Sequence, residues 1–406
     1  MNLLLPTAAP AGERFWSETW PAFLQRAPLA PFAEETLLFL DTFSKKILLD
    51  PDLRRDPAFA ALAHWARRGH LQGYTAHASR HARGVVLHLA PANVDTLFAY
   101  SWFTSLLCGN LNVVRVSTRS LPVIAPLLDT LRSLLAEPRF ADVRERTLLV
   151  SYDHDDALTT RLSSAVHGRL IWGGDETVRA IRALPLPATA LEIAFADRFS
   201  LAAFAAAHVA ELTERALADL AGAFFNDAFQ FGQKACASPR VVVFTGDAGV
   251  CARAAARFWP ALAAVVRTRQ AAFTEADGIA RLASAMAIAA VAPGSRITMR
   301  PADGAPPLVL HAPEWNSEVR ARHDGAGLFV QLDLPDLAAL APHLAPRDQT
   351  LVATGYDDAA LRAFAASLPA RAIDRIVPPG HALDFDPAAW DGHNLFHLLT
   401  REISLP

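Results

Sequence analysis

The sequence predicts an α/β fold in which helices cover both faces of doubly wound parallel sheets. Three observations support this prediction. The chain has 406 residues, 52% of them apolar, which is enough for two or three domains with cores of their own. From residue 84 onward, short apolar runs alternate with longer helical stretches. The runs are apolar throughout, as strands buried on both faces are, and their alternation with helices implies a parallel sheet.

The first half of the chain begins with a helical segment and continues with five expected strands. Residues 1–75 are expected to form helices interrupted by prolines. Helices are also expected at 94–107 and 123–135, with Gly109 as a left-handed cap after the first of them. Such sheets bind ligands at the carboxyl ends of their strands. The expected strands are 84–89, 112–116, 147–151, 170–172 and 191–195.

The second half repeats the alternation of helices and strands. A long helix is expected from about Leu201 to Phe225, because large apolar residues recur there at helical spacing. Two more helices are expected at 251–266 and 279–290. The expected strands are 241–244, 308–311, 328–332 and 350–353.

The composition argues against several classes of partner. A net charge of −3 and a pI near 6.5 give no electrostatic reason to bind nucleic acid or an anionic membrane. Three cysteines without a Cys-x-x-Cys pair indicate a reducing compartment, so a cytoplasmic protein is expected. The longest apolar stretch, Leu282–Pro293, is shorter than the roughly 20 residues of a membrane span, so none is expected.

Two histidines, His77 and His81, have the spacing with which one helix presents two zinc ligands. The surrounding segment offers no third ligand and is rich in arginine. A solvated segment is therefore the simpler interpretation, and no metal site is expected.

Cys236 is the residue whose surroundings indicate chemistry most directly. It lies in Gln230–Pro239, among small residues, just before an expected strand. A thiol in that place is accessible from outside the core and suits a nucleophile, whereas a buried cysteine is the plainer alternative. Cys108, at a helix end, and Cys251, within an alanine-rich helix, are expected to be inert.

Asn93 follows the first strand of the expected sheet. Its side-chain N–H could stabilise a developing oxyanion. On this loop alone, an N-cap for the following helix is the preferred interpretation.

Two further loops could hold a cofactor. Gly173 and Gly174 lie between a strand and a helix, where backbone can approach a phosphate, although they do not form a G-x-G-x-x-G motif. Arg115, Ser117 and Arg119 lie at the end of another strand and could hold a ribose or its 2′-phosphate. A helix cap on the surface is an equally plain interpretation of the second group.

Taken in order, these loops resemble those of aldehyde dehydrogenases. The details are similar to one branch, the LuxC-type acyl-CoA reductases, which make aldehydes from fatty acyl thioesters. The resemblance covers roughly residues 80–400, and the cysteine loop with Ser238-Pro239 is its most specific part. The segments that carry it are Arg115, Trp172-Gly173-Gly174-Asp175, Asp197-Arg198-Phe199-Ser200, Gln233-x-x-Cys236-x-Ser238-Pro239, Asp374-Arg375-Ile376-Val377-Pro378 with Gly380, and Trp390-Asp391-Gly392.

The resemblance implies an aldehyde dehydrogenase-like fold with two α/β domains. Residues 1–75 would be an N-terminal helical segment and 76–205 an NADPH-binding domain. Residues 206–375 would be the catalytic thioester domain with Cys236, and 376–406 a C-terminal segment packing back near the active site.

The resemblance also implies a mechanism. Cys236 would attack an acyl thioester, and Asn93 with the Cys236 backbone N–H would stabilise the oxyanion. NADPH, held by Arg115, Ser117, Gly173 and Gly174, would deliver hydride. The acyl donor would be acyl-CoA or an acyl carrier protein. The resemblance allows an acyl-protein synthetase as a partner, and a homo-oligomer is expected.

One departure bears on the direction of the reaction. Aldehyde dehydrogenases that hydrolyse their thioester use a glutamate within Glu-Leu-Gly-Gly-Lys. If Arg198 stands at the place of that lysine, Ala194 stands at the place of the glutamate and no base is present, which is the preferred match. In the other match Glu192 is the base. Two alternatives to a reductase stay open. One is an aldehyde dehydrogenase that forms acid with Glu192 as base, and the other is a non-catalytic protein that binds an acyl carrier.

Overall fold

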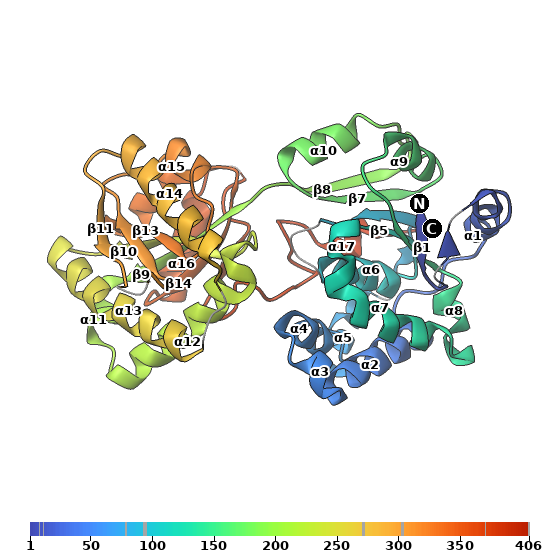
Figure 1. Ribbon diagram of the computed structural model, residues 1–406, viewed down its shortest axis with the longest axis horizontal. Helices are drawn as coiled ribbons and strands as arrows, with labels where there is room; N and C mark the ends of the chain where they lie inside the picture. The colour runs from blue at the N-terminus through green and yellow to red at the C-terminus, as the bar shows by residue number, and fades with distance from the viewer. Residues whose placement is uncertain are drawn as a thin grey trace. The chain divides into compact units, whose positions relative to one another are not determined.

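The computed structural model describes residues 1–7, 9–10, 12–77, 79–91, 96–269, 273–301, 304–369 and 371–404. Two compact units divide the chain. Unit 1 contains Met1–Asp197 and Phe385–Pro406, and unit 2 contains Arg198–Asp384. Each unit is built on its own seven-stranded sheet (Figure 1).

The sheet of unit 1 is parallel apart from its first two strands. Its order is β2-β1-β6-β5-β4-β7-β8. β1 pairs antiparallel with both β2 and β6, whereas the other pairs are parallel. The strands are β1 (Asn2–Leu5), β2 (Ala9–Pro10), β4 (Val85–Leu89), β5 (Leu111–Val116), β6 (Thr147–Ser151), β7 (Gly168–Trp172) and β8 (Leu191–Phe195).

Helices cover both faces of this sheet, as the doubly wound prediction requires. One apolar core lies under α2, α4, α6 and α7, and the other lies under α9 and α10. Two short strands, β3 (His81–Ala82) and β16 (Thr400–Arg401), form a separate antiparallel pair. The helices are α1 (Trp20–Leu24), α2 (Glu34–Leu49), α3 (Pro51–Arg54), α4 (Pro57–Trp65), α5 (Arg68–Leu71), α6 (Leu97–Leu107), α7 (Leu121–Leu135), α8 (Ala141–Arg144), α9 (Asp156–Ser163), α10 (Asp175–Arg182) and α17 (Leu395–Leu398).

The sheet of unit 2 has the order β11-β12-β13-β10-β9-β14-β15. All its pairs are parallel except the edge pair β11 and β12. The two central strands, β9 and β10, are almost wholly buried, which explains why they read as continuous apolar runs. The strands are β9 (Phe199–Ala205), β10 (Pro239–Thr245), β11 (Arg296–Met299), β12 (Leu308–His311), β13 (Leu328–Leu334), β14 (Asp348–Thr354) and β15 (Arg375–Val377).

Helices again cover both faces, with α12 and α13 on one side of the sheet and α14, α15 and α16 on the other (Figure 1). Among the described helices, α13 alone is long and apolar enough to reach a membrane span by length and composition. Its buried residues, including Phe258 and Trp259, belong to the core of unit 2. The helices are α11 (Ala206–Glu211), α12 (Glu214–Phe229), α13 (Ala248–Thr268), α14 (Glu275–Val291), α15 (Ser317–Ala321) and α16 (Asp358–Ser367).

The structure corrects the expected helix at 201–225. Residues 199–205 form β9, and two helices follow, α11 and α12. β9 pairs with β10 on one side and with β14 on the other, so its alanines and phenylalanines are buried in a sheet. The compact units also divide the chain differently from the four expected segments. The N-terminal helices share a core with α6 and α7, and residues 376–384 belong to unit 2.

Candidate active site

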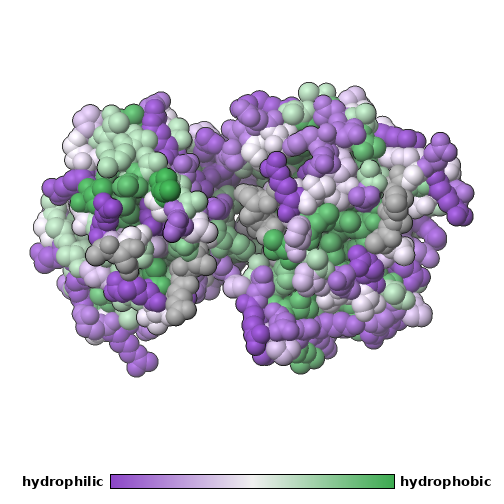
Figure 2. Space-filling model, in the orientation of Figure 1, coloured by the Kyte–Doolittle hydropathy of each residue, from purple (hydrophilic) through white to green (hydrophobic). Residues whose placement is uncertain are grey.

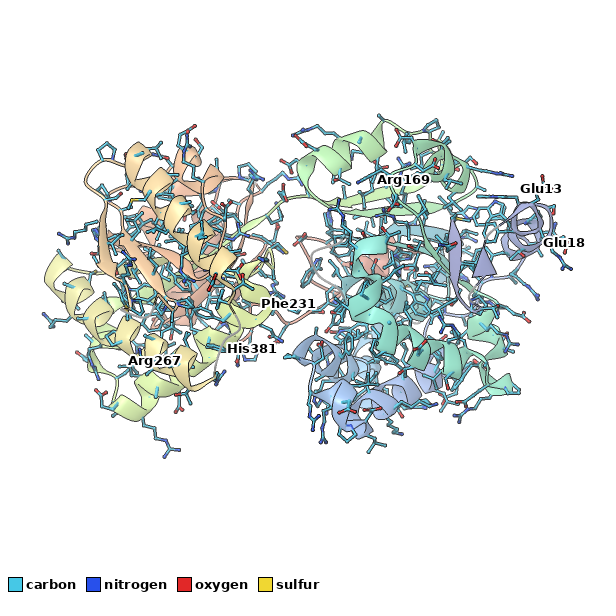
Figure 3. The ribbon with its side chains drawn as sticks, in the orientation of Figure 1. Glu13, Glu18, Arg169, Phe231, Arg267 and His381 are labelled. Atoms are coloured by element: carbon cyan, nitrogen blue, oxygen red, sulfur yellow. The ribbon has the colours of Figure 1, made fainter. Side chains whose placement is uncertain are left out.

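The loop that carries Cys236 lies in unit 2, between α12 and β10. After α12 the chain forms a 3₁₀ turn, Gln230–Gln233, in which three successive residues are left-handed: φ is 61° at Phe231, 59° at Gly232 and 63° at Gln233. Non-glycine residues in sparsely populated regions cost about 1–3 kcal/mol each and persist where surrounding contacts impose them. The turn, where Figure 3 labels Phe231, leads Cys236 to the amino end of β10.

The side chain of Gln233 supplies those contacts. Its Nε2 donates to the carbonyl oxygens of Pro239, at 2.8 Å, and Leu328, at 3.0 Å. Its Oε1 accepts from the backbone N–H of Gly327 at 2.8 Å. One fully buried amide therefore fixes the loop to the starts of two neighbouring strands, β10 and β13. Gly325 has φ +81°, and a Cβ there would lie 2.8 Å from the Gln233 carbonyl oxygen, so the turn requires glycine.

Ser200 holds the carbonyl group of the cysteine itself. The Ser200 hydroxyl donates to the Cys236 carbonyl oxygen at 2.7 Å and accepts from the Thr350 N–H at 3.3 Å. Ser200 is fully buried in β9. Two of the segments that carry the family resemblance, 197–200 and the cysteine loop, therefore meet in unit 2.

Arg198 brings a third such segment to the same edge of the sheet. Its guanidinium donates to the carbonyl oxygen of Pro346 at 2.6 Å and forms an ion pair with Asp374. Arg198, Asp374 and the cysteine loop all directly precede strands, so this is the amino edge of the unit 2 sheet.

The three thiols differ in their surroundings. Cys236 is partly exposed, whereas Cys108 and Cys251 are buried. Burial, together with the nearby charges of Asp333 and Asp247, raises the pKa of Cys251 to about 11. Burial also raises the pKa of Cys108 far above its ordinary value. Because the thiolate is the nucleophilic form, these environments disfavour reaction at Cys108 and Cys251.

Lys234, two residues before Cys236, contacts a carboxylate. Its ammonium lies 3.5 Å from Oδ1 of Asp277 on α14. Hydrogen bonds from Thr274 lower the pKa of that carboxyl and keep it ionised. The Lys234 charge is therefore directed toward Asp277.

In unit 1, the topological switch point lies at β4. This strand pairs with β5 on one side and β7 on the other. In open α/β sheets the ligand crevice lies outside the carboxyl ends at such a point. Gly173 directly follows β7 and so lies at this edge. Asn93 follows β4 but lies outside the described residues, so its role as an oxyanion donor stays a prediction.

The glycine pair forms the turn from β7 into α10. Gly174 is the N-cap residue of α10, and the Gly173 N–H donates to the Phe195 carbonyl oxygen at 3.1 Å. A Cβ at Gly174 would lie 3.2 Å from the Asp197 carboxylate. That carboxylate accepts from the Asp175 N–H at 3.4 Å, so acidic groups already occupy the helix N-terminus. The turn suits close approach of a cofactor better than direct binding of phosphate by α10.

Arg115 is at the carboxyl end of β5, directly beside the switch point. Its Nε and one terminal nitrogen donate to the Tyr152 carbonyl oxygen at 3.2 and 2.9 Å. The guanidinium carbon also lies 5.4 Å from the centre of the Tyr152 ring. These contacts hold the planar group in one orientation, and its other terminal nitrogen has no acceptor among the described residues.

Ser117 and Thr118 continue this edge. The Ser117 hydroxyl accepts from the Arg119 N–H at 3.3 Å. Ser117 therefore caps the turn that follows it, as the simpler interpretation of this group predicts. The Thr118 hydroxyl donates to Asp153 at 2.6 Å. A cavity of about 280 Å³ opens here, lined by Met1, Asn2, Thr118, Ser151, Tyr152, Asp153, His154, Asp155 and Leu158.

A buried polar chain supports the glycine turn, and sequence reasoning missed it. The Trp172 indole N–H donates to the Ser101 hydroxyl at 3.1 Å. Ser101 contacts Nδ1 of His88 at 2.7 Å, and Nε2 of His88 contacts Oδ1 of Asn112 at 3.1 Å. Asn112 in turn donates from Nδ2 to the Asn110 carbonyl oxygen at 2.8 Å. Because Asn112 donates from Nδ2, its Oδ1 accepts from Nε2 of His88, and Nδ1 of the neutral ring then accepts from the Ser101 hydroxyl. In the sequence, the one local sign of these hydrogen-bonded side chains was His88, a histidine inside an apolar strand.

Glu192 is held in ion pairs. Its carboxylate pairs with the fully buried Arg169, which Figure 3 labels, and with Arg182 at 3.2 Å. It lies near the amino end of β8, three residues before Phe195, or roughly 10 Å along the strand. Glu192 therefore has a structural role as the counter-ion of Arg169.

A metal site finds no support in the described ranges, where no group of three or more His, Cys, Asp or Glu residues could hold an ion.

Comparison with known families identifies the chain. A model of the acyl-CoA reductase (LuxC) family matches residues 48–291. The chain belongs to this family. The LuxC family consists of acyl-CoA reductases, so the protein is an oxidoreductase of the aldehyde dehydrogenase type. Among proteins with curated functions, no sequence match was found.

Solved structures confirm the aldehyde dehydrogenase-like fold of this LuxC-family chain. A Mycobacterium tuberculosis aldehyde dehydrogenase complexed with NAD+ has a TM-score of 0.65 and 13% identity, over 94% of this chain and 87% of the other. PnpE in complex with nicotinamide adenine dinucleotide has a TM-score of 0.66 and 17% identity, over 91% and 82%. A putative aldehyde dehydrogenase from Burkholderia cenocepacia has a TM-score of 0.64 and 16% identity, over 92% and 81%.

Proposed function

We propose that the protein reduces a fatty acyl thioester to the aldehyde with NADPH, through an acyl-enzyme on Cys236. The observation that carries the proposal is the cysteine loop. Cys236 is partly exposed, and Gln233 and Ser200 fix the backbone on either side of it. A nucleophile that must meet two reactants in turn needs both access and a fixed position.

In the first step, Cys236 takes the acyl group. A bond forms between its sulfur and the acyl carbon, and the bond from that carbon to the donor sulfur breaks. The proton lost by Cys236 leaves with the departing thiol, so the step is redox-neutral. The Asn93 side-chain N–H and the Cys236 backbone N–H are our candidates for the oxyanion donors.

In the second step, the acyl-enzyme is reduced. A bound nicotinamide cofactor supplies the hydride, as the NAD-bound relatives suggest. Arg115 and Ser117 would hold the ribose side of the cofactor. Gly173 and Gly174 would let the protein backbone approach the cofactor closely. With the hydride and one proton added, the carbon–sulfur bond to Cys236 breaks, which releases aldehyde and restores the thiol.

The preference for NADPH rests on β5. In dinucleotide-binding sheets, an acidic residue near the switch point binds the ribose 2′-hydroxyl of NAD, and an arginine accommodates the 2′-phosphate of NADP. Here the strand beside β4 has Arg115 as its last residue but one, and the exposed Arg119 follows four residues later. Two guanidinium groups at this edge favour the 2′-phosphate.

The surroundings of β8 support reduction over hydrolysis. Glu192 is occupied by Arg169 and Arg182, and Ala194 has no group that could activate water. An acyl-enzyme without a general base persists until hydride arrives. This favours the match in which Ala194 stands at the place of the catalytic glutamate.

The test is NADPH oxidation with acyl-CoA substrates of increasing chain length, combined with mass spectrometry of the trapped acyl-enzyme. We expect aldehyde to form and Cys236 to carry the acyl group, and Cys236→Ala to abolish both. Cys251→Ala, which changes a buried thiol of high pKa, is the control and should retain activity. Full activity of Cys236→Ala would overturn the proposal.

Two other outcomes would assign a different function. Steady formation of acid from free aldehyde and NAD or NADP, without a thiol acceptor, would make the protein an oxidative dehydrogenase. Acylation of Cys236 without NADPH oxidation would make it an acyl-carrier-binding protein. Parallel reactions with acyl-CoA, with acylated carrier protein and with an acyl-protein synthetase would identify the donor.

A further inference from the structure

A buried hydrogen bond inside unit 1 joins the glycine turn to helix α6. The Trp172 indole N–H donates to the Ser101 hydroxyl at 3.1 Å. Trp172 is the last residue of β7 and directly precedes Gly173, whereas Ser101 lies within α6. Trp172 is 5% exposed and Ser101 is 1% exposed, so both partners are shielded from water. The bond therefore fixes the residue from which the glycine turn starts.

Ser101 lies in a helix that is largely apolar. Most residues of α6 are buried, and Trp102 and Phe103 follow Ser101 directly. Figure 2 shows green, hydrophobic surface over the part of unit 1 where Figure 1 places α6 and α7. A buried hydroxyl in such surroundings costs free energy unless it is hydrogen-bonded. Trp172 and His88 are the two partners that satisfy it.

His88 orients the Ser101 hydroxyl. Nε2 of His88 donates to Oδ1 of Asn112 at 3.1 Å, so Nδ1 of the neutral ring accepts the hydroxyl proton at 2.7 Å. Burial lowers the pKa of His88 to about 4, which keeps the ring neutral at neutral pH. Because the hydroxyl proton is directed to His88, an oxygen lone pair of Ser101 is left to accept from Trp172. Each group thus donates to the next along the series Trp172, Ser101, His88 and Asn112.

The Trp172 ring connects this bond to the turn. It stacks on Phe195, with 3.8 Å between the ring centres and 17° between the ring planes. Phe195 is the last residue of β8, and its carbonyl oxygen accepts from the Gly173 N–H at 3.1 Å. Phe195 therefore holds the face of the indole, and Ser101 holds its N–H edge. A rotation of the indole would disturb both the stack and the backbone of Gly173.

The hydrogen bonds on the outer side of the turn are longer. The Asp175 N–H donates to the Asp197 carboxylate at 3.4 Å, and the Asp197 N–H donates to the Asp175 carboxylate at 3.3 Å. Both bonds are exposed to solvent and exceed the usual length of an N–H···O bond. The buried bond between Trp172 and Ser101 is the better placed of these contacts to fix the turn.

We infer that Ser101 is a positioning residue for the nicotinamide cofactor, acting through the Trp172 indole on the turn of Gly173 and Gly174. The inference rests on the proposed function, in which this turn lets the protein backbone approach the cofactor. A turn that is already held in its binding geometry loses less conformational freedom when the ligand arrives, and it binds more tightly. Ser101 is buried in α6, so its effect on the cofactor passes through Trp172.

Trp102, the next residue of α6, provides a matched control. It is fully buried, and its indole N–H has no hydrogen-bond partner in the part of the chain that the structure describes. Its ring packs against Phe39 and Phe103. Replacing Trp102 with phenylalanine removes as much of the indole from the core as the same change at Trp172, but it breaks no hydrogen bond.

The test is a double-mutant cycle on cofactor binding, measured by isothermal titration calorimetry of the full chain with NADPH and no acyl donor. Ser101→Ala removes the acceptor, and Trp172→Phe removes the donor while a ring remains to stack on Phe195. We expect each change to raise the Kd for NADPH roughly 2- to 10-fold. The double variant should raise the Kd no further than the larger single effect, because both changes remove the same bond. Trp102→Phe should leave the Kd unchanged.

Two further measurements separate positioning from a general loss of stability. Urea unfolding should show that Trp102→Phe destabilises the protein, although its Kd for NADPH is that of the wild type. In steady-state reduction of an acyl-CoA, Ser101→Ala should raise the KM for NADPH while kcat stays within about twofold of the wild type.

Three results would overturn the inference. They are an unchanged Kd in both single variants, effects that multiply in the double variant, and a rise in Kd for Trp102→Phe equal to that for Trp172→Phe. A wild-type protein that binds neither NADPH nor NADH would instead overturn the proposed function, and this inference with it.

Discussion

The Gln233 side chain donates a hydrogen bond to the carbonyl oxygen of Pro239, 2.8 Å away, and so closes the loop in which Cys236 lies. The same amide reaches Gly327 and Leu328 at the start of β13. The left-handed turn before Cys236 is thus imposed by a side chain whose donors and acceptor are all directed at backbone. The position of the thiol depends on a residue that need not touch the substrate.

Replacing Gln233 with alanine should therefore damage both stability and acylation. The change leaves the Gly327 N–H and two carbonyl groups without their buried partner, and each such loss costs about 1–3 kcal/mol. We expect the free energy of unfolding in urea to fall by roughly 2–4 kcal/mol. Acyl transfer to Cys236 should also slow at a pH and temperature where the variant is still folded. Gln25→Ala, at an exposed position, is the control and should change neither quantity.

Ser200→Ala should slow the first chemical step more selectively. The variant loses the hydrogen bond from Ser200 to the Cys236 carbonyl oxygen, and such a bond contributes about 0.5–1.5 kcal/mol. We expect single-turnover acylation to fall by up to roughly tenfold.

Ser238→Ala provides a matched control within the same loop. The Ser238 hydroxyl is buried and has no hydrogen-bond partner in the described part of the chain, so its removal should cost little. Equal rates for the two variants would show that Ser200 does not position the cysteine.

The fold was predictable where strands are apolar throughout and helices have clear periodicity. The strand at 199–205 was missed because phenylalanine, leucine and alanine at those positions also suit a helix. Strand formation there depends on β10 and β14, which pair with β9 on both sides and are distant in sequence. The secondary-structure propensity of the segment itself cannot reveal these neighbouring strands.

The candidate site shows the same division between local and distant information. Cys236 stood out because small residues flank it, and Gly173 because it pairs with Gly174 between a strand and a helix. The function of Gln233 depends on Leu328, 95 positions later, and that of Ser200 on Cys236, 36 positions later. The resemblance to the LuxC family indicated these segments, but only their contacts explain why those residue types are present.

Thiol reactivity should distinguish Cys236 from the other two cysteines. Iodoacetamide at pH 8 is expected to modify Cys236 rapidly in the folded protein. Cys108 and Cys251 should react at comparable rates only after unfolding in urea, because burial raises the pKa of both. Peptide mass spectrometry gives the site of modification. Rapid labelling of Cys251 in the folded state would contradict the burial seen here.

Acidification should destabilise the protein through two buried histidines. Burial lowers the pKa of His88 to about 4 and that of His323 to about 3, from 6.5. The unfolded chain therefore binds more protons between about pH 6.5 and pH 4, so stability falls as the pH falls through this window. Each histidine contributes up to roughly 3 kcal/mol of this loss.

Asp227 should act in the opposite direction. Burial raises its pKa to about 6, although the backbone N–H groups of Gly380 and Ala382 donate to it. Protonation of Asp227 therefore favours the folded state as the pH falls from 6 toward 4. Urea unfolding at several pH values is the measurement. We expect a net loss of stability in acid, a shallower loss in His88→Gln, and a steeper one in Asp227→Asn.

Arg119→Ala should separate the two nicotinamide cofactors. If Arg115 and Arg119 hold the 2′-phosphate, removing one exposed guanidinium loses a charge-assisted hydrogen bond of about 1.5–3 kcal/mol. We expect the KM for NADPH to rise roughly 10- to 100-fold, while the KM for NADH changes little, because NADH has no group at that position. Arg161→Ala is the control, since that arginine is also exposed but stacks on Trp16, with 3.8 Å between its guanidinium carbon and the centre of the ring. An equal rise in KM for both cofactors would mean that Arg119 contacts a part they share, and the preference for NADPH would then need another origin.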